Sequence, residues 1–108
     1  MPYAVYILAQ AEDDLFDVYR HVASADSEQK ADRLIQKLRA LCLDLAELPE
    51  RGHVPPELEF IGVLDYLEVH DKPYQVIYQV IGEQFYVHAV IDGRRDLPEL
   101  LEQRLLRP

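Results

Sequence analysis

Cysteine is nearly missing from this sequence of 108 residues, in which Cys42 is the single one. An intrachain disulfide is therefore excluded, and nothing indicates an oxidising compartment. No apolar run approaches the roughly 18 residues that a membrane-spanning helix needs. The N-terminal segment also lacks the basic start and the small-residue cleavage site of a signal peptide. These absences predict one cytoplasmic domain that has a single core and no membrane partner.

Positive charge is also scarce. The chain has 11 Lys and Arg residues against 20 Asp and Glu residues, which gives a formal net charge of −9. Proteins that bind nucleic acids gain much of their affinity by neutralising phosphates with basic side chains. The one short basic candidate is Arg94-Arg95. The composition therefore predicts no direct nucleic-acid partner.

Apolar residues at helical spacing follow a short β-rich run over Tyr3–Leu8. The first helix is expected from about residue 11 to residue 22, ahead of a break at Ser24-Ala25-Asp26. Asp26 and Gln29 resemble a capping box that opens a longer helix, which Pro49 and Gly52 would end. Because the break is short, the two helices should form an antiparallel hairpin. Cys42 falls on the apolar stripe of the second helix and is interpreted as a core residue.

Three strands are expected after an irregular crossing loop at residues 49–62. They run over Val63–His70, Tyr74–Ile81 and Gln84–Ile91, and the short turns between them predict an antiparallel meander. A final short helix should start at Asp96. The predicted fold class is α+β: a strand, an antiparallel helix hairpin, a three-stranded antiparallel meander and a short C-terminal helix.

Strict alternation sorts the meander into two faces. The face expected to contact the helix hairpin is almost wholly apolar and carries Leu64, Tyr66, Tyr74, Val76, Tyr78, Val80, Phe85, Val87, Ala89 and Ile91. The other face mixes apolar and hydrogen-bonding groups and carries Leu67, Val69, Gln75, Ile77, Gln79, Tyr86, His88 and Val90. Such a mixture is typical of a surface that binds protein. Two alternatives remain: the C-terminal helix could cover this second face, and a one-residue register slip would exchange the faces.

Two segments carry a family resemblance that covers essentially the whole chain. The strand Tyr74–Val80 has the pattern Tyr-x-Val-x-Tyr-x-Val, and Ala89–Asp96 ends in Gly-Arg-Arg-Asp. With the order of elements, these segments resemble the RelE/ParE superfamily, the small toxins of bacterial type II toxin–antitoxin pairs. The resemblance implies a cytoplasmic toxin held silent in a hetero-oligomer with its cognate antitoxin, whose tail fills an open groove.

The superfamily divides by target, and this sequence departs from one branch. RelE-like members cut messenger RNA in the ribosome, and ParE-like members inhibit DNA gyrase. The arginine that the resemblance leads one to expect in the Tyr-x-Val-x-Tyr strand is Gln75, no aromatic residue follows Tyr86, and only Arg95, with Arg94 beside it, matches a catalytic position. The sequence therefore favours inhibition of a protein target such as gyrase. The alternatives are a messenger-RNA endoribonuclease that uses Arg95 and His88, and a degenerate toxin that only binds its antitoxin.

The candidate site residues follow from this reading. Arg94 and Arg95 are candidate target contacts, against the alternative of a salt bridge to Asp92 or Asp96. The antitoxin tail is expected to bind through apolar anchors with little dependence on salt, and its candidate contacts are Leu67, Gln75, Ile77, Gln79, Tyr86, His88 and Val90.

Neither a metal nor a cofactor is predicted. Glu68 and His70 lie on one face of a strand, but no second His or Cys follows at a recognised ligand spacing. They are therefore interpreted as ordinary polar residues at a strand end. His21 and His53 fall outside the expected sheet, so no working pair of histidines is evident for acid–base catalysis.

Overall fold

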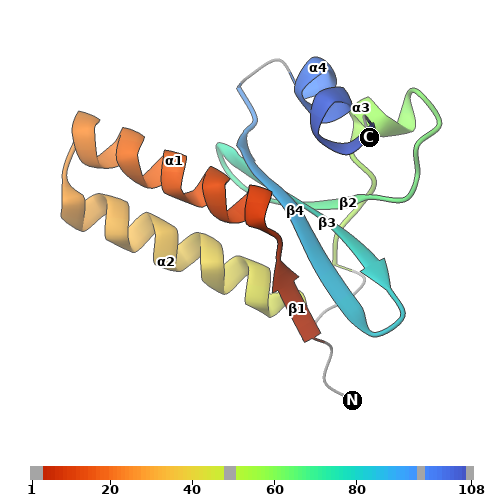
Figure 1. Ribbon diagram of the computed structural model, residues 1–108, viewed down its shortest axis with the longest axis horizontal. Helices are drawn as coiled ribbons and strands as arrows, with labels where there is room; N and C mark the ends of the chain where they lie inside the picture. Colours follow the sequence, from red (N-terminus) through yellow and green to blue (C-terminus); the bar gives the residue numbers. More distant parts are fainter. Residues whose placement is uncertain (1–3, 48–50, 95–96, 107–108) are drawn as a thin grey trace.

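The computed structural model describes residues 4–47, 51–94 and 97–106. Its elements, drawn in Figure 1, are β1 (Ala4–Ile7), α1 (Ala9–Ala25), α2 (Glu28–Asp44), α3 (Pro56–Glu59), β2 (Leu67–Asp71), β3 (Tyr74–Ile81), β4 (Gln84–Asp92), α4 (Leu97–Leu101) and the π-helical turn η1 (Glu102–Leu106). None of the helices in the described part of the chain combines the length and the hydropathy that a bilayer crossing needs.

The four strands form one mixed sheet in the order β1-β4-β3-β2. The strands β2, β3 and β4 pair antiparallel, and β1 joins the edge of the sheet parallel to β4. The sheet lies between the helix hairpin on one side and the short helices α3 and α4 on the other (Figure 1). The predicted α+β class, the hairpin, the meander and the C-terminal helix are confirmed.

The break between α1 and α2 is capped by a different residue from the one predicted. Ser27, not Asp26, is the N-cap of α2: its backbone is extended, and its Oγ accepts a hydrogen bond of 3.1 Å from the Lys30 backbone N–H. Asp26 instead pairs with Lys30 Nζ at 3.0 Å. Both anchors fix the start of the long helix. The helix ends earlier than predicted, at Asp44 with Leu45 as its C-cap, while Pro49 itself lies outside the described residues.

The crossing segment is more ordered than predicted, and the first meander strand is shorter. Pro56 occupies the first turn of α3, where its missing N–H costs nothing. The strand β2 begins only at Leu67, because residues 63–66 form no ladder with β3. Leu64 is 60% exposed, so its predicted place on the helix-facing side of the sheet is wrong.

A β-bulge in β4 accounts for the largest error in the two predicted faces. Ile77 pairs with Ala89 and Tyr78 pairs with Val87, which leaves His88 as the extra residue. Beyond the bulge the alternation is reversed. Ala89 therefore faces away from the hairpin and Val90 faces it, the opposite of what strict alternation predicted.

Each face of the sheet carries its own core. On the hairpin side, Leu15 of α1 and Leu38 of α2 pack against buried residues of the sheet, among them Val69, whose predicted face was also wrong. Cys42 is buried in the same core, and burial raises the pKa of its thiol to about 11, so it acts as a small apolar side chain. On the other side lies a smaller core of Leu58, Ile77, Ala89, Ile91 and Leu101. The alternative in which the C-terminal helix covers the second face is therefore confirmed for part of that face.

The bulge is held by an ion pair between α1 and η1. Arg104 Nη1 and Nη2 lie 2.9 and 3.0 Å from the two oxygens of Asp14, and Arg104 Nη2 also donates to the His88 carbonyl at 3.1 Å. The Val90 backbone N–H donates to Asp14 Oδ2 at 2.9 Å. The side chain of Asp14 is 14% exposed and that of Arg104 is 19% exposed. The pair therefore satisfies two backbone groups of β4 at the bulge, just beyond the point where its pairing with β1 ends.

Replacing Asp14→Ala should destabilise the fold by about 2–4 kcal/mol, because it leaves the Arg104 charge half-buried and the Val90 N–H without its acceptor. Urea unfolding followed by circular dichroism measures this. The matched control is Asp17→Ala one turn further on, which removes an exposed ion pair with Arg20 and should cost less than about 0.5 kcal/mol. Equal losses in the two variants would contradict this role of the pair.

Candidate functional site

Part of the second sheet face remains uncovered, and its side chains define what we call the neutral patch. The neutral patch consists of Tyr6, Gln79, Ile81, Tyr86 and His88. Tyr6 and Tyr86 stack with ring centroids 5.4 Å apart, because β1 and β4 pair in register at these positions. Tyr6 is 45% and Ile81 is 56% exposed. Aromatic and amide groups of this kind suit contact with a polypeptide.

His88 occupies the bulge at the border of the neutral patch. Its Nε2 lies 3.2 Å from Gln79 Oε1, and the Tyr66 ring meets its own ring edge to face at 5.3 Å. Burial, and next the positive charge of Arg104, lower the pKa of His88 below the usual 6.5. His88 is therefore neutral at pH 7 and adds no positive charge to this surface.

Four of the predicted antitoxin contacts are not on an open surface. Ile77 is buried beneath the short helices, and Val90 is buried on the hairpin side. Leu67 also packs against the hairpin core, and Gln75 is buried against Glu68, to whose Oε1 its Nε2 donates. Their expected exposure is wrong because neither the bulge nor the register of β2 against β3 was foreseen, and because the C-terminal cover, one of the two alternatives, is present over part of this face. Gln79, Tyr86 and His88 stay predictions as antitoxin contacts.

Of the two candidate arginines, only Arg94 lies within the described residues. Arg94 is exposed, but its guanidinium forms a two-pronged contact with Asp92, with Nη2 to Oδ2 at 2.6 Å. The salt-bridge alternative thus holds for Arg94. Arg95 and Asp96 lie outside the described residues. The catalytic pairing of Arg95 with His88 therefore stays a prediction.

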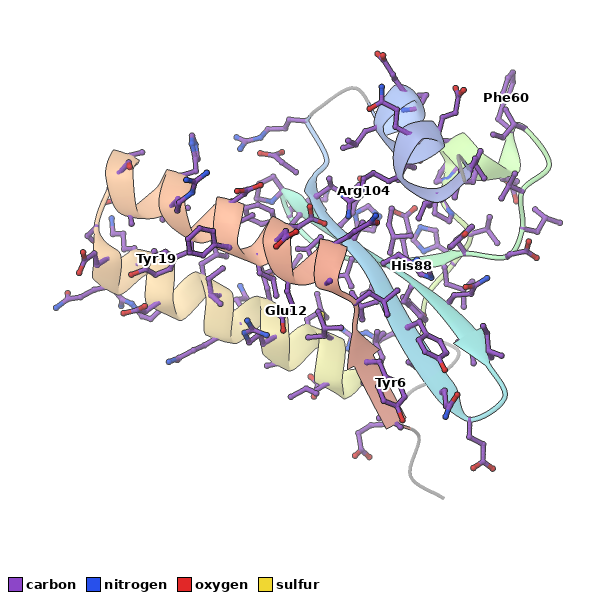
Figure 2. The ribbon with its side chains drawn as sticks, in the orientation of Figure 1. Tyr6, Glu12, Tyr19, Phe60, His88 and Arg104 are labelled. Carbon is purple, nitrogen blue, oxygen red and sulfur yellow. The ribbon has the colours of Figure 1, made fainter. Side chains whose placement is uncertain are left out.

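Three features of the site come from segments that lie far apart in the sequence. Tyr6 joins the neutral patch from β1, and Arg104 reaches the bulge from η1, as Figure 2 shows. His53 lies beside β2, where its backbone forms an isolated antiparallel β-bridge with Glu68. The spacing of residues within one segment cannot predict such contacts, because each depends on which segments the topology places side by side.

A second apolar surface lies after α3. Phe60 is 91%, Ile61 55% and Leu64 60% exposed, and Figure 2 shows Phe60 projecting from this end of the molecule. Neighbouring exposed apolar side chains of this size are typical of protein contacts.

This arrangement of a helix hairpin on a meander, with an N-terminal strand added at the edge, is the fold of RelE/ParE toxins. The chain is similar to the solved structure entitled "Chromosomal ParDE TA system from P. aeruginosa", with a TM-score of 0.70 and 16% identity over 83% of this chain and 95% of that one. It is also similar to the toxin-antitoxin complex RelBE2 from Mycobacterium tuberculosis, with a TM-score of 0.63 and 16% identity over 85% and 92% of the two chains.

The sequence itself identifies the family. The family model described as "ParE toxin of type II toxin-antitoxin system, parDE" matches residues 5–97, and the chain belongs to this family. No curated protein sequence matches it significantly. The resemblance to the superfamily, and with it the toxin component of a type II pair, is confirmed.

Since the pKa of His88 is lower in the folded chain than in the unfolded one, protonation of His88 favours unfolding. The contribution of neutral His88 to the stability of the fold is fully present above pH 6.5. It is lost as the pH falls from 6.5 through the pKa of His88 in the folded chain. The ring signals of His88, assigned with the variant His88→Gln, should titrate below pH 6.5 in an NMR series. The variant should also lose less stability than the wild type between pH 7 and pH 5. A His88 midpoint at or above 6.5 would contradict the argument.

Proposed function

We propose that this toxin acts by binding and inhibiting a protein target, with DNA gyrase as the specific candidate, and that a cognate antitoxin neutralises it. The observation that carries the proposal is the absence of charge on the neutral patch at neutral pH. All five members of the patch are uncharged there, because the pKa of His88 is lowered. A surface of this kind can bind a polypeptide but has no group with which to neutralise phosphates.

The one described arginine that reaches the patch does not change this balance. Arg104 touches the His88 carbonyl, but both of its terminal nitrogens are bound to Asp14. An arginine engaged in this way cannot stabilise charge developing on a cleaved phosphate without breaking the contact that holds the bulge. The geometry therefore supports protein inhibition over ribonuclease action.

Gln75 supports the same branch. An arginine at this position would belong to the ribonuclease pattern. The amide that replaces it is buried and hydrogen-bonded to Glu68, so it presents no cation to the surface. Gyrase as the particular target rests on the ParE family of the chain, and the neutral patch by itself indicates only a polypeptide.

The antitoxin is assigned to the neutral patch. The two similar structures are toxin–antitoxin systems by their titles, and we propose the same kind of partner here. The tail would lie over Tyr6 and Ile81, the exposed members of the patch, and over Tyr86, which stacks on Tyr6. Binding through apolar anchors should depend weakly on ionic strength, since few charges are neutralised.

Expression of the chain alone in bacteria should cause early loss of negative supercoiling and a DNA-damage response, before protein synthesis falls. Plasmid topoisomer gels and pulse labelling measure the two effects, and co-expression of the protein from an adjacent small reading frame is the control that should reverse them. Prompt cleavage of messages inside ribosomes would instead establish the endoribonuclease alternative. A folded chain that binds its antitoxin without slowing growth would establish the degenerate toxin.

Tyr6→Ala should weaken binding of that adjacent-frame protein about tenfold, as expected for the loss of an aromatic anchor. Tyr19→Ala is the matched control, because Tyr19 lies on α1 away from the sheet (Figure 2), and its affinity should stay near the wild-type value. Calorimetry at low and moderate salt measures both. The assignment fails if Tyr6→Ala binds as the wild type does, or if the wild-type Kd rises steeply with salt.

A further inference from the structure

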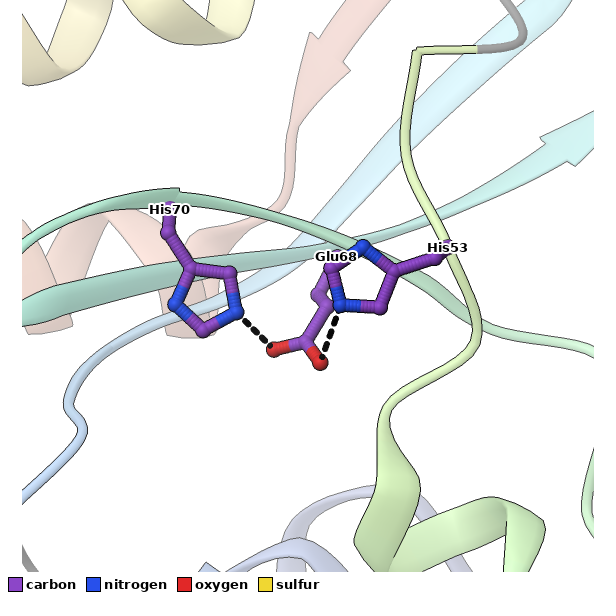
Figure 3. Close-up of side chains that lie close together, drawn as sticks. All are labelled: His53, Glu68 and His70. Atoms are coloured by element: carbon purple, nitrogen blue, oxygen red, sulfur yellow. Dashed lines mark ion pairs between the residues drawn. The ribbon is translucent and has the colours of Figure 1, made fainter.

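Two histidines flank a buried glutamate at the opposite corner of the second face from the neutral patch. His53 Nε2 lies 3.1 Å from Glu68 Oε2, and His70 Nε2 lies 2.9 Å from Glu68 Oε1 (Figure 3). One ligand atom from each of the three residues can be chosen so that all lie within 4.8 Å of one another. The two imidazole rings are parallel, with centroids 5.6 Å apart, and turn the same nitrogen toward the carboxylate. We name these three residues the His–Glu–His cluster.

The backbone holds the cluster in place. The Glu68 N–H donates to the His53 carbonyl at 2.7 Å, and the His53 N–H donates to the Glu68 carbonyl at 3.2 Å. Gly52 permits this close approach, because a Cβ there would lie 2.8 Å from the Glu68 carbonyl oxygen and 2.2 Å from the Tyr78 hydroxyl. Gln75 Nε2 donates to Glu68 Oε1 and orients the carboxylate from behind. His53 is therefore fixed opposite β2 before any ligand binds.

Three acceptor oxygens around the cluster lack a hydrogen-bond donor in the part of the chain that the structure describes. They are Glu57 Oε1, Glu68 Oε2 and Gln75 Oε1, and all three are buried. The contact from His53 to Glu68 Oε2 is close but not aligned as a hydrogen bond. The three residues line the same open pocket of about 450 Å³, together with His53 and His70. Buried acceptors without donors are costly, and a cation is the group that would satisfy several of them at once.

We propose that the His–Glu–His cluster is a binding site for a divalent transition-metal ion of the zinc class. Two neutral imidazoles and one carboxylate are a ligand set that zinc accepts, whereas calcium and magnesium prefer oxygen ligands alone. Bonds of about 2.0–2.2 Å in a tetrahedron place ligand atoms about 3.3 Å apart. The existing nitrogen–oxygen separations of 2.9 and 3.1 Å are near this value.

Small movements would complete the site. The side chains of His53 and His70 are 61% and 40% exposed, so their rings can turn toward one ion while Glu68, at 1%, stays fixed. The ion would bind each neutral ring through an unprotonated Nε2, with the ring proton on Nδ1, and would fasten the segment around His53 to β2. Its fourth position would face the pocket and hold water or a partner's ligand atom. Metal binding can be tested without knowledge of the toxin target or of the antitoxin surface.

The test uses the full chain without a histidine tag, stripped of metal with a chelator. Cobalt(II) should give one equivalent of tetrahedral visible absorption, and zinc should bind with the same stoichiometry in calorimetry. His53→Ala and His70→Gln each remove a direct ligand and should weaken zinc binding by more than the roughly 10–100-fold seen for outer-shell changes. His21→Ala is the matched control, because His21 lies on α1 away from the cluster, and its zinc affinity should equal that of the wild type.

Folding is checked separately by urea unfolding of each variant without metal, so that lost binding is not confused with lost structure. His53→Ala is the informative variant here, since its side chain is exposed and its backbone bridge does not need the imidazole. The proposal is overturned if wild-type protein binds less than one equivalent of zinc, if its cobalt spectrum is octahedral and weak, or if the folded His53→Ala variant binds zinc as the wild type does.

Discussion

The ion pair between Asp14 and Arg104 is the constraint on which the rest of this structure depends. It brings α1 and η1 to the same point of β4, where it satisfies the His88 carbonyl and the Val90 amide beside the bulge. By stabilising the bulge, the pair turns Ala89 into the small core and Val90 into the large one. The division of β4 between the two cores therefore depends on one extra residue, His88.

The same ion pair shapes the surface that is left. The C-terminal segment covers part of the second face. Arg104 approaches the uncovered part, but its guanidinium is already paired with Asp14. The desolvated position of His88 beside that cation favours the neutral imidazole. An aromatic and amide surface therefore remains where a nuclease would need positive charge. The fold and the proposed preference for a protein partner thus have one electrostatic cause.

The sequence predicted those features that depend on local periodicity, and it failed where one residue changed the phase. The meander over Tyr74–Ile81 and the helix hairpin follow from alternation and from apolar stripes, and both are present. The bulge at His88 inserts a residue with no local signal, so every face assignment beyond it was reversed. The partnership of His53 with Glu68 could not be foreseen for another reason: it depends on a loop whose path is set by the close approach at Gly52.

Gln75 links the choice of branch to the His–Glu–His cluster. An arginine at this position would bring a positive charge to Glu68, whereas the amide brings only a hydrogen bond to the buried carboxyl group. Among the described residues, His53 and His70 are the ionisable groups in ion-pair contact with this carboxyl group. A glutamine at the position where a ribonuclease would carry an arginine thus also leaves the buried carboxylate open to the two histidine side chains or to a metal ion.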